Sequence, residues 1–335
     1  MSADRTNGEG AAWNLGDAFL TDALLGEIAA RGHEAHAIDF GGARAAGGGD
    51  RSPAQGLKDL HRHVRSSDLV IVGGGTMLQD DATDRLLAGL PRLCAVTRAS
   101  AWLARRPLAY FGVGCDPVDR LSARALLRIA VSRSSVWVRE TNSLERVRAL
   151  GSQNAQLAAD ACLLPNVDQL LPAPSDRSGA AIALNFRDEV ELTPIALNAL
   201  RKMGPLVVIG MSQGSALADV GPHTRSLVAP SELIPEPASW RTAASAIGKS
   251  SMLVASRMHA LYMAALMGTP VIALGRSAKV RSFAEEFRVP RADSLAGLDL
   301  GLARPADPDR LLAARKRAVN GLDSILSEIS REDGR

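Results

Sequence analysis

The chain has 335 residues, which is long enough for two domains that each bury a core of their own. Three widely spaced cysteines, no apolar run of about 18 residues and a polar start without a signal-peptide core favour a cytoplasmic protein. The net charge of +3 suits a small anionic ligand or contact with an acidic membrane surface, and we expect no nucleic acid partner.

The first half of the chain alternates between predicted helices and strands. Helical patterns cover residues 18–31, 57–66, 84–105, 122–132 and 143–150. Short apolar runs predict strands over residues 36–40, 69–72, 108–113 and 136–139, and residues 157–164 complete this half. Residues 41–56 are rich in glycine, alanine and arginine and are expected to form a loop. Pro91 is expected to break the long helix in which it lies.

A Pro-rich linker at residues 165–179 precedes a second series of the same kind. Strands are predicted over residues 180–186, 206–209, 252–255 and 271–274, and helices over 194–203, 240–248, 257–267 and 309–329. Such alternation predicts an α/β protein with two Rossmann-like domains, parallel sheets and a cleft between the domains. The expected boundaries are 1–170 for the first domain, 178–305 for the second and 306–335 for a C-terminal helix.

The segment Ser256-Arg257-Met258-His259 carries the strongest chemical signal. It joins a predicted buried strand to a predicted helix, with Ser256 as the expected N-cap. The first turn of a helix favours an anion, arginine adds a bidentate fork, and histidine can move a proton near neutral pH. The alternative is an ordinary helix start with a surface arginine and a buried histidine.

Other loops carry weaker signals. The glycines Gly73, Gly74 and Gly75 would let the backbone approach a ligand closely, although no P-loop lysine follows. A cluster of acids at Asp80, Asp81 and Asp84 is compatible with a metal site but is more typical of a helix cap. The pattern G-x-S-x-G around Ser212 follows a strand, as the nucleophile turn of a hydrolase does. Such a turn is followed by a long helix, and Gly221-Pro222 is expected to interrupt any helix that begins there.

Taken together, these segments resemble the polysaccharide pyruvyl transferase family from Asn14 to about Pro290. The residues that carry the resemblance are Asn14-Leu15-Gly16-Asp17, residues 68–75, Gly112-Val113-Gly114, Val138-Arg139-Glu140, Asp160-Ala161, Ser256 to Ala260, residues 268–272 and Lys279. The resemblance implies a glycosyltransferase-B-like fold and transfer of pyruvate from phosphoenolpyruvate to two sugar hydroxyls as a ketal. It also places Arg257 and His259 in the phosphoenolpyruvate site.

Phosphoenolpyruvate carries a phosphate and a carboxylate, so its site needs several cations, and the reaction needs a general acid and a general base. The catalytic candidates are His259, Arg257 and Asp17. The donor-binding candidates are Ser256, Arg257, Met258, His259, Lys279, Arg139 and Arg187. The candidate loops on the acceptor side contain Asn14, Gly16, Gly73, Gly74, Gly75 and Asp116. We expect no metal and no cofactor, since phosphoenolpyruvate is a co-substrate.

Two alternatives remain open from the sequence: a nucleotide-sugar glycosyltransferase of the same architecture, and a non-catalytic binding or assembly member of the fold. Residues 1–13 are polar and rich in glycine, so we expect them not to form a full central strand. Shielding of the resulting sheet edge would be compatible with a homodimer. The acceptor is expected to be a sugar, a glycan or a related small molecule.

Overall fold

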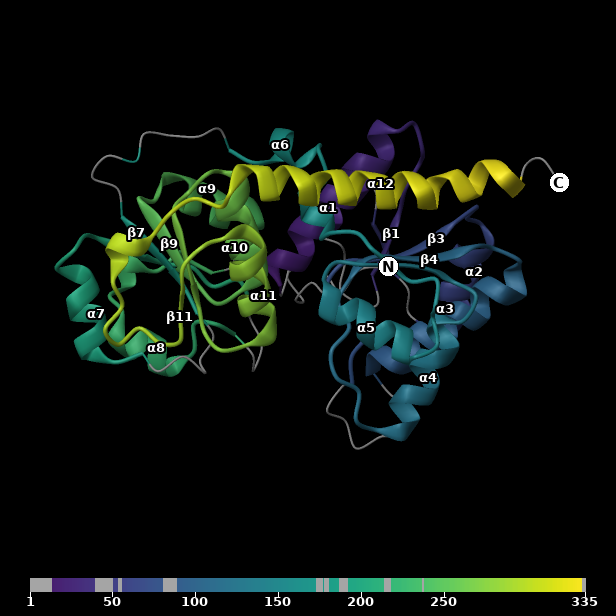
Figure 1. The fold of residues 1–335 in the computed structure, drawn as a ribbon, viewed down its shortest axis with the longest axis horizontal. Helices are drawn as coiled ribbons and strands as arrows, with labels where there is room; N and C mark the ends of the chain where they lie inside the picture. The colour runs from purple at the N-terminus through teal and green to yellow at the C-terminus, as the bar shows by residue number, and fades with distance from the viewer. Residues whose placement is uncertain are drawn as a thin grey trace. The chain divides into compact units, whose positions relative to one another are not determined.

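The computed structural model describes residues 14–39, 51–53, 56–80, 89–172, 177, 181–186, 192–213, 218–236 and 238–332. The chain divides into two compact units, and each is described by itself (Figure 1). Unit 1 comprises Leu20–Pro165 and Ala314–Arg335, and unit 2 comprises Asn166–Ala313 together with the described residues 14–19. Two continuous helices each begin in unit 2 and end in unit 1.

Unit 1 is built on a parallel sheet of four strands in the order β3-β4-β5-β6. Its strands are β3 (Val70–Gly73), β4 (Leu108–Val113), β5 (Ser135–Val138) and β6 (Gln156–Leu157). Its helices include α2 (Leu57–Arg65), α3 (Gly89–Ala104), α4 (Leu121–Val131) and α5 (Thr141–Ala149). Every residue of β4 is buried, as is typical of a strand in a parallel sheet with both faces covered.

A separate parallel pair joins β1 (Ala37–Asp39) to β2 (Arg51–Pro53). The sequence predicts a loop over residues 41–56, so that prediction is wrong for residues 51–53. The three residues of β2 show no apolar alternation, and it is the partner strand β1 that makes them a strand. Residues 41–50, and residues 1–13 with the predicted lack of a full strand, lie outside the described part of the chain.

Pro91 does not break α3. The helix begins at Gly89, so Pro91 stands in its first turn, where a missing backbone N–H removes no intrahelical hydrogen bond. Proline in this position starts a helix rather than ending one. The preceding residues 84–88, which the sequence predicts as helical, lie outside the described residues.

Unit 2 contains a parallel sheet of five strands in the order β11-β10-β9-β7-β8. The strands are β7 (Ile182–Asn185), β8 (Leu206–Val208), β9 (Met252–Ala255), β10 (Val271–Leu274) and β11 (Arg291–Ala292). The helices are α6 (Val167–Leu170), α7 (Pro194–Arg201), α8 (Pro222–Leu227), α9 (Trp240–Lys249), α10 (Met258–Leu266) and α11 (Ala278–Phe287). Short 3-10 turns occur in both units at Ala161–Leu163, Pro230–Glu232 and Leu300–Leu302.

Two helices belong to both units. The first, α1 (Leu15–Ala30), passes from unit 2 to unit 1 after Phe19, and α12 (Pro308–Glu332) does so after Ala313. Within unit 1, Gly321 of α12 lies so close to the sheet that an added Cβ would stand 3.1 Å from the ring of Trp137. Arg31 also donates a hydrogen bond to Asp323 at 2.7 Å. No helix among the described residues is both long and apolar enough to cross a membrane.

Candidate functional site

The site begins at the place where the sheet of unit 2 changes direction. The chain runs from β7 to β8 on one side and then returns to form β9 on the other side of β7. Ligands of open α/β sheets bind outside the carboxyl ends of strands at such a switch point. The last residue of β7 is Asn185, which is paired in register with Ala255 at the end of β9.

Asn185 joins the ends of three strands. Its side chain is fully buried, and its Nδ2 donates hydrogen bonds to the Ile209 carbonyl at 2.8 Å and to Asp219 Oδ2 at 3.1 Å. Its Oδ1 accepts from the backbone N–H of Arg257 at 3.2 Å, and its carbonyl accepts from that of Ser256 at 2.9 Å. This one amide therefore fixes where the chain after β9 turns into α10.

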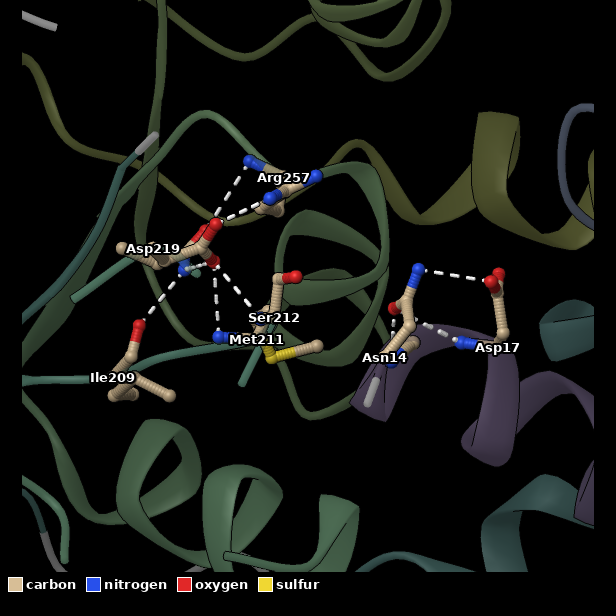
Figure 2. Close-up of polar contacts among 9 residues, drawn as sticks. Asn14, Asp17, Ile209, Met211, Ser212, Asp219 and Arg257 are labelled. Atoms are coloured by element: carbon tan, nitrogen blue, oxygen red, sulfur yellow. Dashed lines mark hydrogen bonds and ion pairs between the residues drawn. The ribbon is translucent and has the colours of Figure 1, made fainter. Parts of the chain in front are cut away.

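Asp219 is the buried charge of the site, with only 1% of its surface exposed. Its Oδ2 accepts hydrogen bonds from the backbone N–H groups of Met211 at 3.0 Å and Ser212 at 3.2 Å (Figure 2). Its Oδ1 accepts from Arg257 Nε at 2.8 Å, and it also contacts Arg257 Nη2. A carboxylate held on both oxygens in this way sets the direction of the arginine side chain.

Arg257 itself is the N-cap of α10, with an extended backbone, so the expectation that Ser256 caps this helix is wrong. The reason is that the Asn185 side chain engages the backbone N–H of Arg257, which keeps that residue outside the helix. Met258 is then the first helical residue and His259 the second. Ser256, Arg257 and Met258 are all partly exposed, so the first turn of α10 is open to a ligand.

His259 is buried and packs directly on Gly16 near the start of the chain. A Cβ added to Gly16 would lie 2.6 Å from Cγ and 2.7 Å from Cβ of His259, which no side chain can occupy. The glycine of the Asn-Leu-Gly-Asp motif is therefore required by the histidine of the Arg-Met-His motif. The two segments are 243 positions apart in the chain and meet within unit 2.

Asn14 caps α1 and holds Asp17. Its Oδ1 accepts from the backbone N–H groups of Gly16 at 3.0 Å and Asp17 at 3.3 Å, while its Nδ2 donates to Asp17 Oδ2 at 2.8 Å (Figure 2). The backbone of Asn14 also forms an antiparallel bridge with Ser212. The backbone N–H of Leu15 donates to the Met211 carbonyl at 2.8 Å, so the first turn of α1 is fixed to the same loop that Asp219 holds.

The sequence assigns Asn14 and Gly16 to loops on the acceptor side. In the structure both residues belong to unit 2, the unit that also contains the donor candidates Arg257 and His259. Lys279 belongs to the same unit as the second residue of α11, which follows β10 at the carboxyl edge of the sheet. Arg187 lies outside the described residues.

The remaining candidates lie in unit 1. Arg139 is buried, contacts the fully buried Asp160 at 3.1 Å and donates to Thr76 Oγ1 at 3.3 Å. Gly114 makes room for it, since a Cβ there would stand 3.0 Å from Arg139 Nη2. These contacts favour a structural role for Arg139, which ties the ends of the strands of unit 1 together. Asp116 is half-buried, and its backbone N–H bonds to the Leu78 carbonyl at 3.0 Å.

The glycines at the end of β3 and directly after it have a packing role. A Cβ on Gly73 would lie 2.5 Å from Leu24 Cδ2, and one on Gly74 would lie 2.5 Å from Leu20 Cγ, so both positions allow α1 to pack closely. Gly74 and Gly75 also adopt a φ of +65°, which favours glycine. The sequence predicts close approach by a ligand here, whereas the structure shows close approach by a helix.

The acidic cluster that follows is explained differently. Asp80 accepts from the backbone N–H of Arg120 at 2.9 Å and from its Nε at 2.5 Å. Hydrogen bonding from this guanidinium lowers the pKa of Asp80. The side chain is therefore committed to an ion pair, rather than to a metal or a helix cap. Asp81 and Asp84, the other members of the expected cluster, lie outside the described residues.

Comparison with known proteins identifies the family and the fold. The sequence pattern described as polysaccharide pyruvyl transferase matches residues 14–277. The chain is similar to UDP-GlcNAc 2-epimerase from Neisseria meningitidis bound to UDP-GlcNAc, with 12% identity, a TM-score of 0.55, and coverage of 93% of this chain and 98% of that chain. It is also similar to UGT89C1 from Arabidopsis thaliana complexed with UDP, with 11% identity, a TM-score of 0.56, and coverage of 94% and 97%. These likenesses confirm the expected glycosyltransferase-B fold.

Proposed function

Because the chain belongs to the polysaccharide pyruvyl transferase family, whose members are transferases of polysaccharide biosynthesis, we propose that it uses phosphoenolpyruvate as donor. The pyruvate unit would pass to hydroxyls of a sugar or glycan precursor and form a ketal. The observation that carries this proposal is the placement of Arg257. Buried Asp219 and Asn185 hold this arginine at the switch point of the sheet of unit 2, beside His259.

Donor binding rests on three features of this edge. Asp219 orients the guanidinium of Arg257 through Nε and Nη2, and a guanidinium is a planar fork that suits carboxylate and phosphate groups. The open first turn of α10 presents backbone N–H groups and the positive end of the helix dipole. Lys279 adds a cation at the start of α11. Together they suit a ligand that carries both a phosphate and a carboxylate.

Catalysis requires a proton donor and a proton acceptor near the bound donor. We assign His259 to deliver a proton to the methylene carbon of phosphoenolpyruvate, which leaves C2 electron-poor and open to attack by an acceptor hydroxyl. The C2–O bond to phosphate then breaks, phosphate leaves, and a second hydroxyl attacks C2 and loses its proton. Asp17, held by Asn14 within the same unit, is our candidate for the base that accepts a hydroxyl proton.

The donor assignment is tested by titration calorimetry of the full chain with phosphoenolpyruvate. A charge-assisted contact is worth about 1.5–3 kcal/mol, so Arg257→Ala should weaken donor binding by roughly ten- to a hundredfold. Arg225→Ala is the matched control, because Arg225 also lies in unit 2 and also forms an ion pair, with Glu236 at 2.8 Å. His259→Asn should keep donor binding but lose phosphate release in the presence of acceptor.

The same titration with UDP-sugars tests the alternatives. Two of the similar structures hold UDP or UDP-GlcNAc, so a UDP-sugar is the appropriate competitor. Tight binding of a UDP-sugar without binding of phosphoenolpyruvate would contradict the proposal and favour a glycosyltransferase. Binding of neither compound would favour a non-catalytic member of the family. Stoichiometric labelling of Ser212 by a fluorophosphonate would favour a hydrolase.

A further inference from the structure

Unit 1 carries a cluster of arginines that the proposed function does not use. Arg98, Arg105, Arg106 and Arg133 line one open hollow at the ends of α3 and α4, and we call this group the arginine pocket. Trp102 and Leu103 line the same hollow. No acidic side chain is among the described residues that line it, so the hollow concentrates positive charge.

The charges of the arginine pocket are poorly compensated. Arg98 donates to the Ser132 carbonyl at 2.7 Å, and burial, together with the positive charge of Arg133, lowers its pKa. Arg106 approaches Asp68 only at 3.5 Å, and its buried Nε has no hydrogen-bond partner among the described residues. Among the residues that the structure describes, no carboxylate forms an ion pair with Arg98, Arg105 or Arg133. An anion bound in the hollow would offset this repulsion.

Two of these arginines adopt a left-handed backbone conformation that residues other than glycine rarely adopt. Arg105 directly follows α3 and has a φ of 54°, and Arg133 follows the C-cap of α4 with a φ of 53°. Glycine is the usual residue for this left-handed conformation at a helix end, since it has no Cβ to crowd the backbone. Arginine therefore stands where glycine would be easier to accommodate, and at both positions its charge lines the same hollow.

Apolar side chains lie beside this charge. Trp102 is 64% exposed and Leu103 is 66% exposed, and both belong to the last turn of α3. Ile129 of α4 is also exposed, and its carbonyl accepts from the hydroxyl of Ser132, the residue that Arg98 contacts. Tryptophan and arginine together are typical of the interface between a membrane and water, where apolar groups enter the acyl region and cations meet headgroups.

We propose that this surface, formed by the arginine pocket with Trp102 and Leu103, binds the anionic headgroups of a membrane surface. A single-stranded nucleic acid would also suit arginine and an aromatic ring, but Leu103 and Ile129 offer no flat face on which a base could stack. Both are aliphatic groups that an acyl layer accommodates. The proposal concerns unit 1 alone and is independent of the donor site in unit 2.

The test is cosedimentation of the full chain with vesicles. We expect binding to vesicles of phosphatidylcholine and phosphatidylglycerol in equal parts, little binding to pure phosphatidylcholine, and weakening by salt. Arg105→Gly and Arg133→Gly remove charge at positions where glycine suits the backbone, so the fold should be retained. Each should weaken binding about fivefold, since one basic residue near the surface is worth about 1 kcal/mol.

The matched control is Arg288→Gly, because Arg288 is the other arginine with a left-handed backbone among the described residues, at φ 53°, and lies in unit 2. It should leave vesicle binding unchanged. Trp102→Ala should weaken binding by roughly tenfold through loss of apolar burial. Equal binding to neutral vesicles, an equal loss in Arg288→Gly, saturable binding of inorganic phosphate without any binding to anionic vesicles, or a preference for single-stranded RNA over vesicles would each overturn the proposal.

Discussion

Gly16 is the residue through which the Asn-Leu-Gly-Asp motif contacts His259 of the Arg-Met-His motif. Gly16→Ala would place a methyl group 2.6 Å from the imidazole Cγ of His259, so the ring or the start of α1 must shift. We expect a loss of about 1–3 kcal/mol in the free energy of unfolding, as for other overpacked sites, and weaker donor binding. Denaturant unfolding and calorimetry measure the two effects. Gly204→Ala is the control, because its Cβ would meet Ile182 only at an ordinary 3.7 Å.

Asp219 should matter for stability as well as for the site. Asp219→Asn keeps the shape but removes the charge that faces Arg257, and the amide group must turn one N–H toward donors that now lack an acceptor. We expect a loss of about 1.5–3 kcal/mol, the range for hydrogen bonds to charged groups. A double-mutant cycle with Arg257→Ala measures the coupling between the two residues. Additive effects would contradict the role that we assign to Asp219.

These residues also show what the sequence could and could not predict about the site. Arg257 and His259 are predictable because they stand at a strand-to-helix junction, and local pattern is enough to place them there. Neither Asp219 nor Asn185 is among the site candidates that the sequence suggests. Their roles depend on the meeting of β7, β8 and β9 at one edge, and nothing in the local sequence encodes which strands become neighbours.

At the scale of elements, the C-terminal half of α12 belongs to the core of unit 1. Its inner residues Ala314, Ala318, Leu322 and Ile325 are fully buried. Leu322→Ala should therefore cost about 2–5 kcal/mol in the free energy of unfolding of unit 1, through lost burial and a residual cavity. Leu312, on the same helix, is 53% exposed, so Leu312→Ala should change stability little. Urea unfolding followed by circular dichroism checks both, and similar losses would contradict this role.

The elements themselves were predictable to different degrees. The buried strands β3, β4, β9 and β10 follow from apolar runs bounded by turns, because burial of both strand faces leaves a strong compositional signal. The prediction at Pro91 fails because proline ends a helix in its interior but starts one in its first turn, and α3 uses it in the second way.

At the scale of the whole molecule, the cysteines report on one unit only. Cys94, Cys115 and Cys162 are all buried and all lie in unit 1. Burial raises the pKa of the Cys115 thiol to about 12, and it raises that of Cys162 as well. Because alkylation requires the thiolate, iodoacetamide at pH 8 should modify these residues only when unit 1 opens.

Mass spectrometry of the alkylated chain makes this a test of independence between the units. Leu322→Ala should accelerate modification, whereas Asp219→Asn, which weakens unit 2, should leave the rate nearly unchanged. Rapid alkylation of the unaltered protein, at the rate of a free thiol, would contradict the burial of these side chains.

The division of α1 and α12 between the units has a consequence for synthesis on the ribosome. Domains usually fold in the order in which they are made, with the N-terminal one first. Here the last piece of unit 1, from Ala314 onward, is translated after the whole of unit 2. Unit 2 therefore has its described residues 14–19 and 166–313 available first. Unit 1 is completed last, although its larger part, Leu20–Pro165, precedes residues 166–313 of unit 2 in the sequence.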